Sequence, residues 1–395
     1  MNTIYVDNAA TTRLSDTALK AMMPLMQDIY GNPSSLHHIG QEAKEQLEAA
    51  RRIVADCINA PNPNEIYFTA GGSEADNQAI LTAAYNGAKK GKKHIISSKF
   101  EHHAVLHTLD KLAKEGFEIE LLDVYSNGIV RVEDVKSAIR PDTALVTIMF
   151  ANNEVGTIQP IAEIGAVCRE AGVVFHTDAV QAVGHIPVDV QAMNIDMLSI
   201  SAHKFHGPKG VGALYCKKGI PLQNLINGGA QERNKRAGTE NTYAIAGFAA
   251  AIREAVDNLE KNGKYISALR DKLINGMKDI ERCHLNGDIN KRLPGTVNFS
   301  FEGIEGESLI LLLDQKGICS SSGSACTSGS LDPSHVLLSM GVPIENAHGS
   351  LRLSLCEYNT EEEIDFILDT LHTVVPYLRS ISPVWEKILK GEVIE

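Results

Sequence analysis

Cysteine pairs, long apolar runs and an excess of basic residues are all missing from this 395-residue sequence. The seven cysteines are scattered, and no two of them form a Cys-x-x-Cys pair. This pattern argues against a disulfide framework and against a four-ligand zinc site, and it favours free thiols in a reducing compartment. No run approaches the ~18 apolar residues that span a bilayer, and the chain does not open on a basic and then apolar segment. We therefore expect a cytoplasmic protein with no membrane partner and no signal peptide.

Basic residues are too few for a general affinity for nucleic acid. Lysine and arginine number 37 against 49 acidic residues, which gives a net charge of −12. Nucleic-acid-binding proteins usually carry the opposite balance, so we expect no direct nucleic-acid partner. Apolar residues make up 44% of the chain and charged residues 22%, as in ordinary globular proteins with a large core.

Helical and strand-like segments alternate from about residue 40 to residue 215. This alternation predicts an α/β fold with a large, mostly parallel sheet and helices on both of its faces. Beyond about residue 281 the strands become shorter and mix with helices, which predicts a smaller α+β domain. We expect a large domain over residues 16–260 and a small domain made of residues 1–15 and 261–395. The strands expected in the large sheet are 66–68, 94–96, 119–122, 144–150, 173–175 and 197–200.

Polar residues that could bind a ligand or take part in catalysis follow three of these predicted strands. Gly72 and Ser73 open a helix, where free backbone N–H groups would bind a phosphate. Asp178 ends a buried strand, where its carboxylate needs a cationic partner. Lys204 ends another strand and would project into a cleft, whereas Lys209 lies in a Gly-Pro-Lys-Gly turn and would be solvated. Taken singly, each has a plainer reading: a helix-capping serine, a helix-capping aspartate and a surface lysine.

The order of these three features is more specific than any one of them. A phosphate loop, an acid for a ring nitrogen and then a lysine that forms a Schiff base are expected of an enzyme that uses pyridoxal 5'-phosphate (PLP). The sequence therefore predicts a PLP enzyme of the aminotransferase-like fold, fold type I.

Longer motifs make the resemblance specific. Over essentially its whole length the chain resembles the NifS/IscS-type cysteine desulfurases, which are class-V aminotransferase-like PLP enzymes. The matching stretches are Tyr5-Val6-Asp7-Asn8-Ala9-Ala10-Thr11-Thr12, Gly31-Asn32-Pro33-Ser34-Ser35, Gly72-Ser73-Glu74, Glu101-His102, Asn152-Asn153-Glu154-Val155-Gly156, His176-Thr177-Asp178-Ala179-Val180-Gln181, Ser201-Ala202-His203-Lys204, Arg236-Ala237-Gly238-Thr239 and Ser321-Ser322-Gly323-Ser324-Ala325-Cys326.

The resemblance implies a role for each site residue. Lys204 would carry the cofactor, Asp178 would pair with its ring nitrogen, and His102 would stack on the ring and move protons. The residues that would hold the rest of the cofactor are Asn153 and Gln181 at the phenolic oxygen, and Gly72, Ser73, Ser201, His203 and Thr239 at the phosphate, with Thr239 coming from a second subunit.

Two residues are expected to bind the substrate, L-cysteine. By resemblance, Arg352 would bind the carboxylate, a task suited to a forked cation, and Asn32 would assist it. The plainer reading of Arg352 is a surface arginine in a salt bridge. Close to Arg352 the chain reads Cys356-Glu357 where the family often has Gly-Arg, which leaves the identity of the protein partner open.

Cys326 lies among serines and glycines that cannot form a packed core, so we expect it on an exposed loop. By resemblance its thiolate would accept sulfur as a persulfide. Cys319, at the end of an apolar stretch, is expected to be buried. We expect no metal site, apart from a transient iron–sulfur cluster or the persulfide sulfur at Cys326.

The resemblance therefore implies a homodimeric cysteine desulfurase. It would release L-alanine and pass sulfur to acceptors such as an iron–sulfur scaffold or a thiolation enzyme. Two alternatives remain open at this point: a selenocysteine lyase or another PLP enzyme of the same fold, and a sulfur-carrier protein without turnover.

Overall fold

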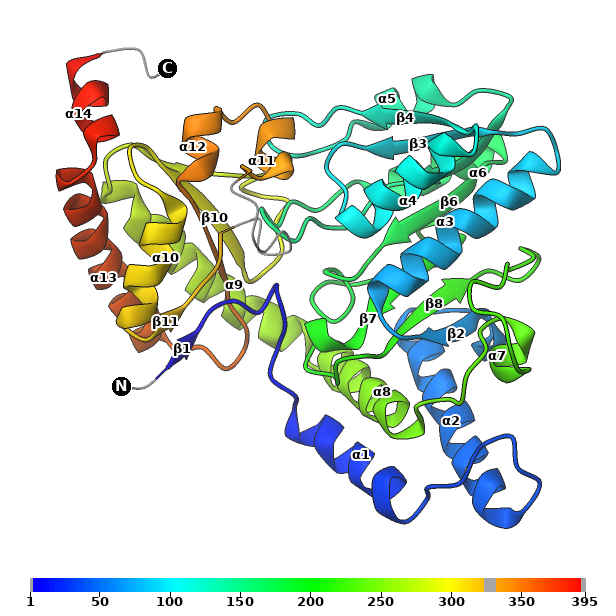
Figure 1. Ribbon diagram of the computed structural model, residues 1–395. Coiled ribbons are helices and arrows are strands. Elements are labelled where there is room, and N and C mark those ends of the chain that lie inside the picture. The colour runs from blue at the N-terminus through cyan, green and yellow to red at the C-terminus, as the bar shows by residue number, and fades with distance from the viewer. Residues whose placement is uncertain (1–2, 323–331, 392–395) are drawn as a thin grey trace.

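The computed structural model describes residues 3–322 and 332–391. Its main feature is a seven-stranded sheet in the order β2-β8-β7-β6-β5-β3-β4 (Figure 1). Strands β7, β6, β5, β3 and β4 run parallel, whereas β8 pairs antiparallel with both β2 and β7. The predicted mostly parallel sheet is confirmed. The strands are β2 (Ile66–Thr69), β3 (His94–Ser98), β4 (Glu118–Leu122), β5 (Thr143–Thr147), β6 (Val174–Asp178), β7 (Met197–Ser201) and β8 (Gly212–Cys216).

Both faces of this sheet are covered by helices. Neighbouring residues of the strand β5 enter different cores. Leu145 belongs to the core that contains Ile80 and Leu109, whereas Val146 belongs to the core that contains Leu47 and Phe248. Such a strand is apolar on both sides, as parallel strands between two helical layers are. The helices of this part are α1 (Asp16–Gln27), α2 (His38–Cys57), α3 (Gly72–Ala88), α4 (His103–Lys114), α5 (Val132–Ala138), α6 (Ile161–Ala171), α7 (Gln231–Asn234) and α8 (Thr242–Asp257).

A smaller, separate core lies beside the large sheet (Figure 1). Its sheet has the antiparallel order β12-β10-β9, and a two-stranded parallel sheet joins β1 to β11. Ile4 and Val6 belong to this core together with residues from 266 onward, so the N-terminal segment packs with the last third of the chain. The exact domain boundaries stay a prediction. The elements are β1 (Ile4–Tyr5), α9 (Leu259–Gly276), β9 (Cys283–Leu285), β10 (Thr296–Phe301), α10 (Gly306–Gln315), β11 (Ile318–Cys319), β12 (Ser350–Ser354), α13 (Glu361–Ser380) and α14 (Pro383–Lys390). Helices α11 (His335–Ser339) and α12 (Ile344–His348) lie between β11 and β12 in sequence, but their buried apolar residues belong to the large core.

The described cysteines agree with the expectation of free thiols. The six of them within residues 3–322 and 332–391 form no disulfide. The prediction that Cys319 is buried is wrong, because its side chain is partly exposed at the end of the short strand β11. None of the described helices is long and apolar enough to cross a membrane.

Candidate active site

A pocket of about 260 Å³ opens where the strands of the large sheet end. Ligands of open α/β sheets bind at this edge, because the loops after the carboxyl ends of the strands converge there. The N-terminal segment passes the pocket on its way from β1 to α1 (Figure 1) and forms one wall. The lining residues are Ala9, Ala10, Gly72, Ser73, Asp76, His102, Met149, Ala151, Asn153, Asp178, Val180, Gln181, Ser201, His203, Lys204 and Arg352.

Lys204 lies in this pocket, as predicted from its place after a buried strand. It ends the short 3-10 helix η2 (Ala202–Lys204), which follows β7 directly. Its Nζ donates hydrogen bonds to the carbonyl oxygens of Ala9 at 2.6 Å and Ala10 at 2.8 Å. The amine is therefore held against the N-terminal segment, at the wall of the pocket.

Asp178 is the last residue of β6 and is only 6% exposed. Its Oδ1 accepts a hydrogen bond from the backbone N–H of Val180 at 2.9 Å. Burial raises the pKa of this carboxyl, while His102, the Val180 N–H and Lys204 act in the opposite direction. A cation placed against Asp178 would keep it ionised, and a protonated ring nitrogen is such a cation.

The third feature is the start of helix α3, which lies next to the pocket. Helix α3 begins at Gly72, and its first N–H groups have no partner within the helix. Gly72 and Ser73 share an adjoining cavity of about 480 Å³ with Ser201 and His203. We call the start of α3 at Gly72 and Ser73, with Ser201 and His203 beside it, the Gly72 cradle. A Cβ atom at Gly72 would lie 2.6 Å from a methyl carbon of Val180, so only glycine fits at this position.

The environment of the cradle suits a phosphate group. The N-terminus of α3 carries a partial positive charge, and Lys209 also lines the cavity. His203 bonds through Nδ1 to the hydroxyl of Thr11 at 3.1 Å. Burial and then Lys204 lower the pKa of His203 to about 4, so its ring is neutral near pH 7. Lys209 is exposed, as expected, but its place at this cavity was not predicted from the sequence.

Three further predicted residues line the main pocket. His102 caps α4, with its Nδ1 accepting a hydrogen bond from the N–H of Ala104 at 3.1 Å. Gln181 donates from Nε2 to the carbonyl oxygen of Ala9 at 2.9 Å. Asn153 lies across the pocket and accepts a hydrogen bond from Arg352 on its backbone oxygen at 3.1 Å.

Arg352 is not a surface residue, so the plainer reading of it is wrong. It lies on the central part of β12, with its side chain 2% exposed, and its Nη2 donates to Asp7 at 2.8 Å. Within the described residues, its buried Nε has no hydrogen-bond partner. A buried guanidinium with one unused donor at a pocket wall is suited to bind an anionic group.

Two predicted site residues do not reach the pocket in this single chain. Asn32 is exposed on the loop between α1 and α2, where its side chain accepts a hydrogen bond from the N–H of Ser34. Thr239 is exposed after α7. Cys326 lies outside the described residues.

Asp76 is a pocket residue that the sequence analysis missed. It is 1% exposed on α3, with Oδ1 3.7 Å from Nε2 of the buried His176. Burial and then the charge of Asp178 raise the pKa of the Asp76 carboxyl well above its usual value. The signal was the spacing, because residue 76 follows Gly72 by four positions and so lies on the same helix face.

Comparison with known proteins agrees with this geometry. The model of the aminotransferase class-V family matches residues 4–367. The chain belongs to this family. It is 54% identical over 392 residues to the cysteine desulfurase IscS of Clostridium botulinum, covering 98% of both chains. It is 51% identical over 384 residues to the IscS of Methanosarcina thermophila, covering 97% of this chain and 95% of that one.

Solved structures also match closely. A NifS-like protein superposes with a TM-score of 0.89 at 40% identity, covering 95% of this chain and 100% of that chain. The protein SspA, solved in complex with cysteine, superposes with a TM-score of 0.80 at 36% identity, covering 91% of this chain and 100% of that one. The family membership and the fold-type-I architecture predicted from the sequence are thereby confirmed.

Proposed function

We propose that the protein is a PLP-dependent cysteine desulfurase. L-cysteine and a protein thiol react to give L-alanine and a persulfide on that thiol. The observation that carries the proposal is the meeting of Lys204, Asp178 and His102 in one pocket beside the start of α3. The names of its relatives, which share half of their residues with this chain, support the same activity.

The donor set fits PLP. Asp178 is a buried carboxylate in need of a cation, and the Gly72 cradle has no room for a side chain. Lys204 would hold the aldehyde carbon, while Ser73, Ser201 and His203 would hold the phosphate, and Gln181 and Asn153 would bond to the phenolic oxygen. When bound, the cofactor supplies an electron-poor ring that stabilises the negative charge left at Cα when its proton is removed.

Three residues of the chain would bind the substrate and transfer its protons. Arg352 binds and orients the carboxylate of L-cysteine through its forked donors. The amine of Lys204 would take the proton from Cα of the substrate. His102, at the N-cap of α4, lines the pocket and would move protons there.

Cys326 is the sulfur acceptor in this proposal. Its thiolate attacks the sulfur of the substrate, so that an S–S bond forms as the C–S bond breaks. The electron pair of the C–S bond stays with the carbon skeleton, which takes up protons and leaves as alanine. A thiolate is required, because a neutral thiol is a weak nucleophile.

The described residues on both sides of the Cys326 segment are attached beside the pocket. Ser321 exchanges backbone hydrogen bonds with Arg352, at 2.7 and 3.3 Å. Ser334 donates from its hydroxyl to the buried Glu154, the neighbour of Asn153. These two anchors keep the ends of the segment within reach of the substrate site.

We further propose a homodimer in which Thr239 and Asn32 serve the partner's site. Both residues are exposed in the single chain. Large apolar side chains on and after α1 are exposed as well, among them Met23 at 50%, Met26 at 54% and Leu36 at 94%. An exposed apolar patch of this kind marks an interface more often than free surface.

The test is anaerobic incubation of the purified protein with L-cysteine. We expect one alanine per sulfur transferred and a mass increase of one sulfur atom on the peptide that contains Cys326. Cys326→Ser should abolish both while the cofactor remains bound, and the matched variant Cys319→Ser should retain both. Full alanine production by Cys326→Ser, or its loss in Cys319→Ser, would overturn the assignment of the thiol.

The same experiment separates the alternatives. A sulfur carrier without turnover would release no alanine, and a selenocysteine lyase would act on selenocysteine without forming the Cys326 persulfide. The acceptor downstream, an iron–sulfur scaffold or a thiolation enzyme, and the cytoplasmic location stay predictions.

A further inference from the structure

Three side chains that the proposed reaction does not use meet next to the active-site pocket. They are His206, Cys356 and Glu357, and one donor atom of each lies within 4.8 Å of the others. We propose that they form a metal site for a borderline-soft divalent cation of the Zn²⁺ class. Zinc binds imidazole nitrogen, thiolate sulfur and carboxylate oxygen, and these are the three donors present.

His206 is held in an orientation that leaves one ring nitrogen for the cluster. Its backbone has φ of 65°, in the left-handed region that a residue with a side chain rarely adopts. The N–H of His206 donates to the hydroxyl of Thr12 at 2.8 Å, and the ring lies edge-on to Tyr358 with centroids 5.1 Å apart. These contacts keep the unusual backbone and the ring direction in place.

The other ring nitrogen determines the tautomer. Nδ1 of His206 lies 2.9 Å from the carbonyl oxygen of Arg13, which can only accept, so Nδ1 carries the hydrogen. Metal-binding histidines commonly make this bond, because it fixes the ring and directs the second nitrogen at the metal. Nε2 faces the carboxylate of Glu357 at 3.3 Å. A lone pair facing a carboxylate needs a positive charge between them, supplied by a proton or by a metal ion.

Cys356 and Glu357 follow β12 and approach the histidine from the small-domain side. Cys356 is 8% exposed, and its N–H donates to the side chain of Asn359 at 2.9 Å, which fixes the turn. Glu357 is partly exposed, which leaves an entry path for an ion. A divalent ion with one thiolate, one carboxylate and a neutral imidazole has no net charge, so the site can be partly buried at little cost.

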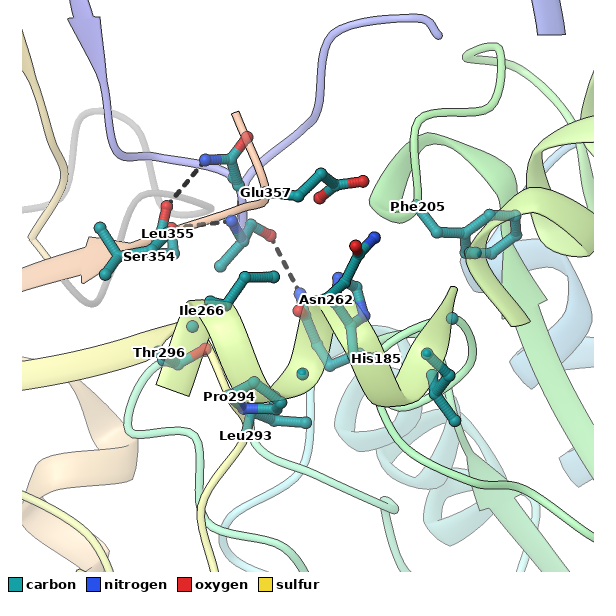
Figure 2. A pocket seen from close by; sticks show the side chains of 18 of the residues that line it. His185, Phe205, Asn262, Ile266, Leu293, Pro294, Thr296, Ser354, Leu355 and Glu357 are labelled. Atoms are coloured by element: carbon teal, nitrogen blue, oxygen red, sulfur yellow. Dashed lines mark hydrogen bonds between the residues drawn. The ribbon is translucent and has the colours of Figure 1, made fainter. Parts of the chain in front are cut away.

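A small cavity beside the cluster offers room for a fourth ligand. It has a volume of about 40 Å³, and His206 is among the residues that line it. Figure 2 labels two others, His185 and Glu357. One or two water molecules fit in such a space. Nδ1 of His185 is buried and has no hydrogen-bond partner among the described residues. A water in this cavity would complete a four-coordinate site, as in zinc sites with three protein ligands.

The three ligands come from two segments that are far apart in the sequence, so a bound ion would connect these segments. His206 stands two residues after Lys204, on the turn that follows η2, whereas Cys356 and Glu357 belong to the segment after β12. Ala9 and Gln181 line both this cavity and the active-site pocket. A bound ion would therefore tie the small sheet to the turn that carries Lys204, and would raise the thermal midpoint of unfolding by mass action.

Metal content tests the proposal without turnover, so its outcome is separate from that of the proposed function. The holoenzyme carrying Cys326→Ser, which removes the loop thiol, is dialysed against Zn²⁺ and then against metal-free buffer. We expect one retained zinc per chain and a higher thermal midpoint with zinc than without. With Co²⁺ in its place, we expect the intense visible bands of a four-coordinate site with a thiolate ligand.

Two variants in the same background locate the ion. Cys356→Ser should lose the retained zinc and the intense cobalt bands, and Glu357→Gln, which keeps the size of the side chain, should lose the retained zinc. Cys319→Ser is the matched control and should keep both. Equal zinc retention by Cys356→Ser and Cys319→Ser, or no retained zinc in the parent protein, would leave only a His206–Glu357 ion pair and overturn the proposal.

Discussion

Lys204 and Lys209 are close in the sequence but lie at different cavities. Lys204 was predicted from its place at the end of an apolar strand, and its Nζ lies against the carbonyl oxygens of Ala9 and Ala10 at the pocket wall. Lys209 is five residues away and exposed, at the cavity suited to phosphate. The two lysines therefore differ in what they can reach, which a substitution can test.

We expect Lys204→Ala to lose covalent attachment of the cofactor and all alanine production. The reason is that no other lysine lines the described part of the main pocket. The measurement is the mass of the protein after borohydride reduction, which fixes an attached cofactor. Lys209→Ala should keep the attachment. Reduced cofactor found on Lys204→Ala but missing from Lys209→Ala would assign the attachment to Lys209 instead.

Other features of the site depend on contacts that the sequence does not show. The four-residue spacing from Gly72 places Asp76 on the same face of α3, but nothing in its neighbours shows that the fold buries it near Asp178. His206 and Glu357 are about 150 positions apart, so only the folded chain brings them together. Residues next to strand ends are predictable because the strand pattern places them, whereas contacts between distant segments depend on packing that one sequence does not encode locally.

At the scale of secondary structure, the site depends on how closely α3 approaches the segment after β6. The sequence predicted the strand, the two glycines and the helix start at residues 66–73. It did not predict that the helix start lies against the segment after β6. A Cβ on Gly72 would lie 2.6 Å from a methyl carbon of Val180, a stiff β-branched side chain two residues beyond Asp178.

We expect Gly72→Ala to weaken cofactor binding. The added methyl group must push the start of α3 away from Val180, and overpacking of this kind costs about 1–3 kcal/mol, or roughly tenfold to a hundredfold in affinity. Cofactor retained on serial dilution measures the effect. Gly263→Ala is the control, because its nearest neighbour is 4.0 Å away, and it should retain the cofactor as the parent does. Equal retention by both variants would refute the close-approach argument.

At the scale of the whole molecule, the proposed homodimer rests on the exposed apolar side chains of α1 and on the exposed Thr239. We expect light scattering to give twice the chain mass. Met23→Glu, which places a charge on the exposed face of α1, should shift the protein toward monomer and reduce alanine production along with it. A monomer with full activity per chain would contradict the shared site, and a dimer that Met23→Glu leaves intact would place the interface elsewhere.

Stability of the whole molecule should also depend on pH through a histidine at the centre of the large sheet. His176 on β6 is fully buried, bonded to the hydroxyls of Thr147 and Ser199, and burial lowers its pKa to about 3. In the unfolded chain a histidine titrates near pH 6.5, so between these values the unfolded state binds more protons than the folded state.

The free energy of unfolding must therefore fall as the pH drops below about 6.5, with His176 contributing about 2 kcal/mol of that loss by pH 5. His176→Gln removes the titration and retains an amide that can bond to both hydroxyls. Denaturant unfolding at pH 7 and pH 5 should show a smaller loss in this variant than in the parent. The exposed His38 supplies the control, since His38→Gln should leave the pH dependence as it is. If His176→Gln lost as much stability on acidification as His38→Gln, the acid sensitivity of the fold would come from other groups, and the buried neutral imidazole would have no part in it.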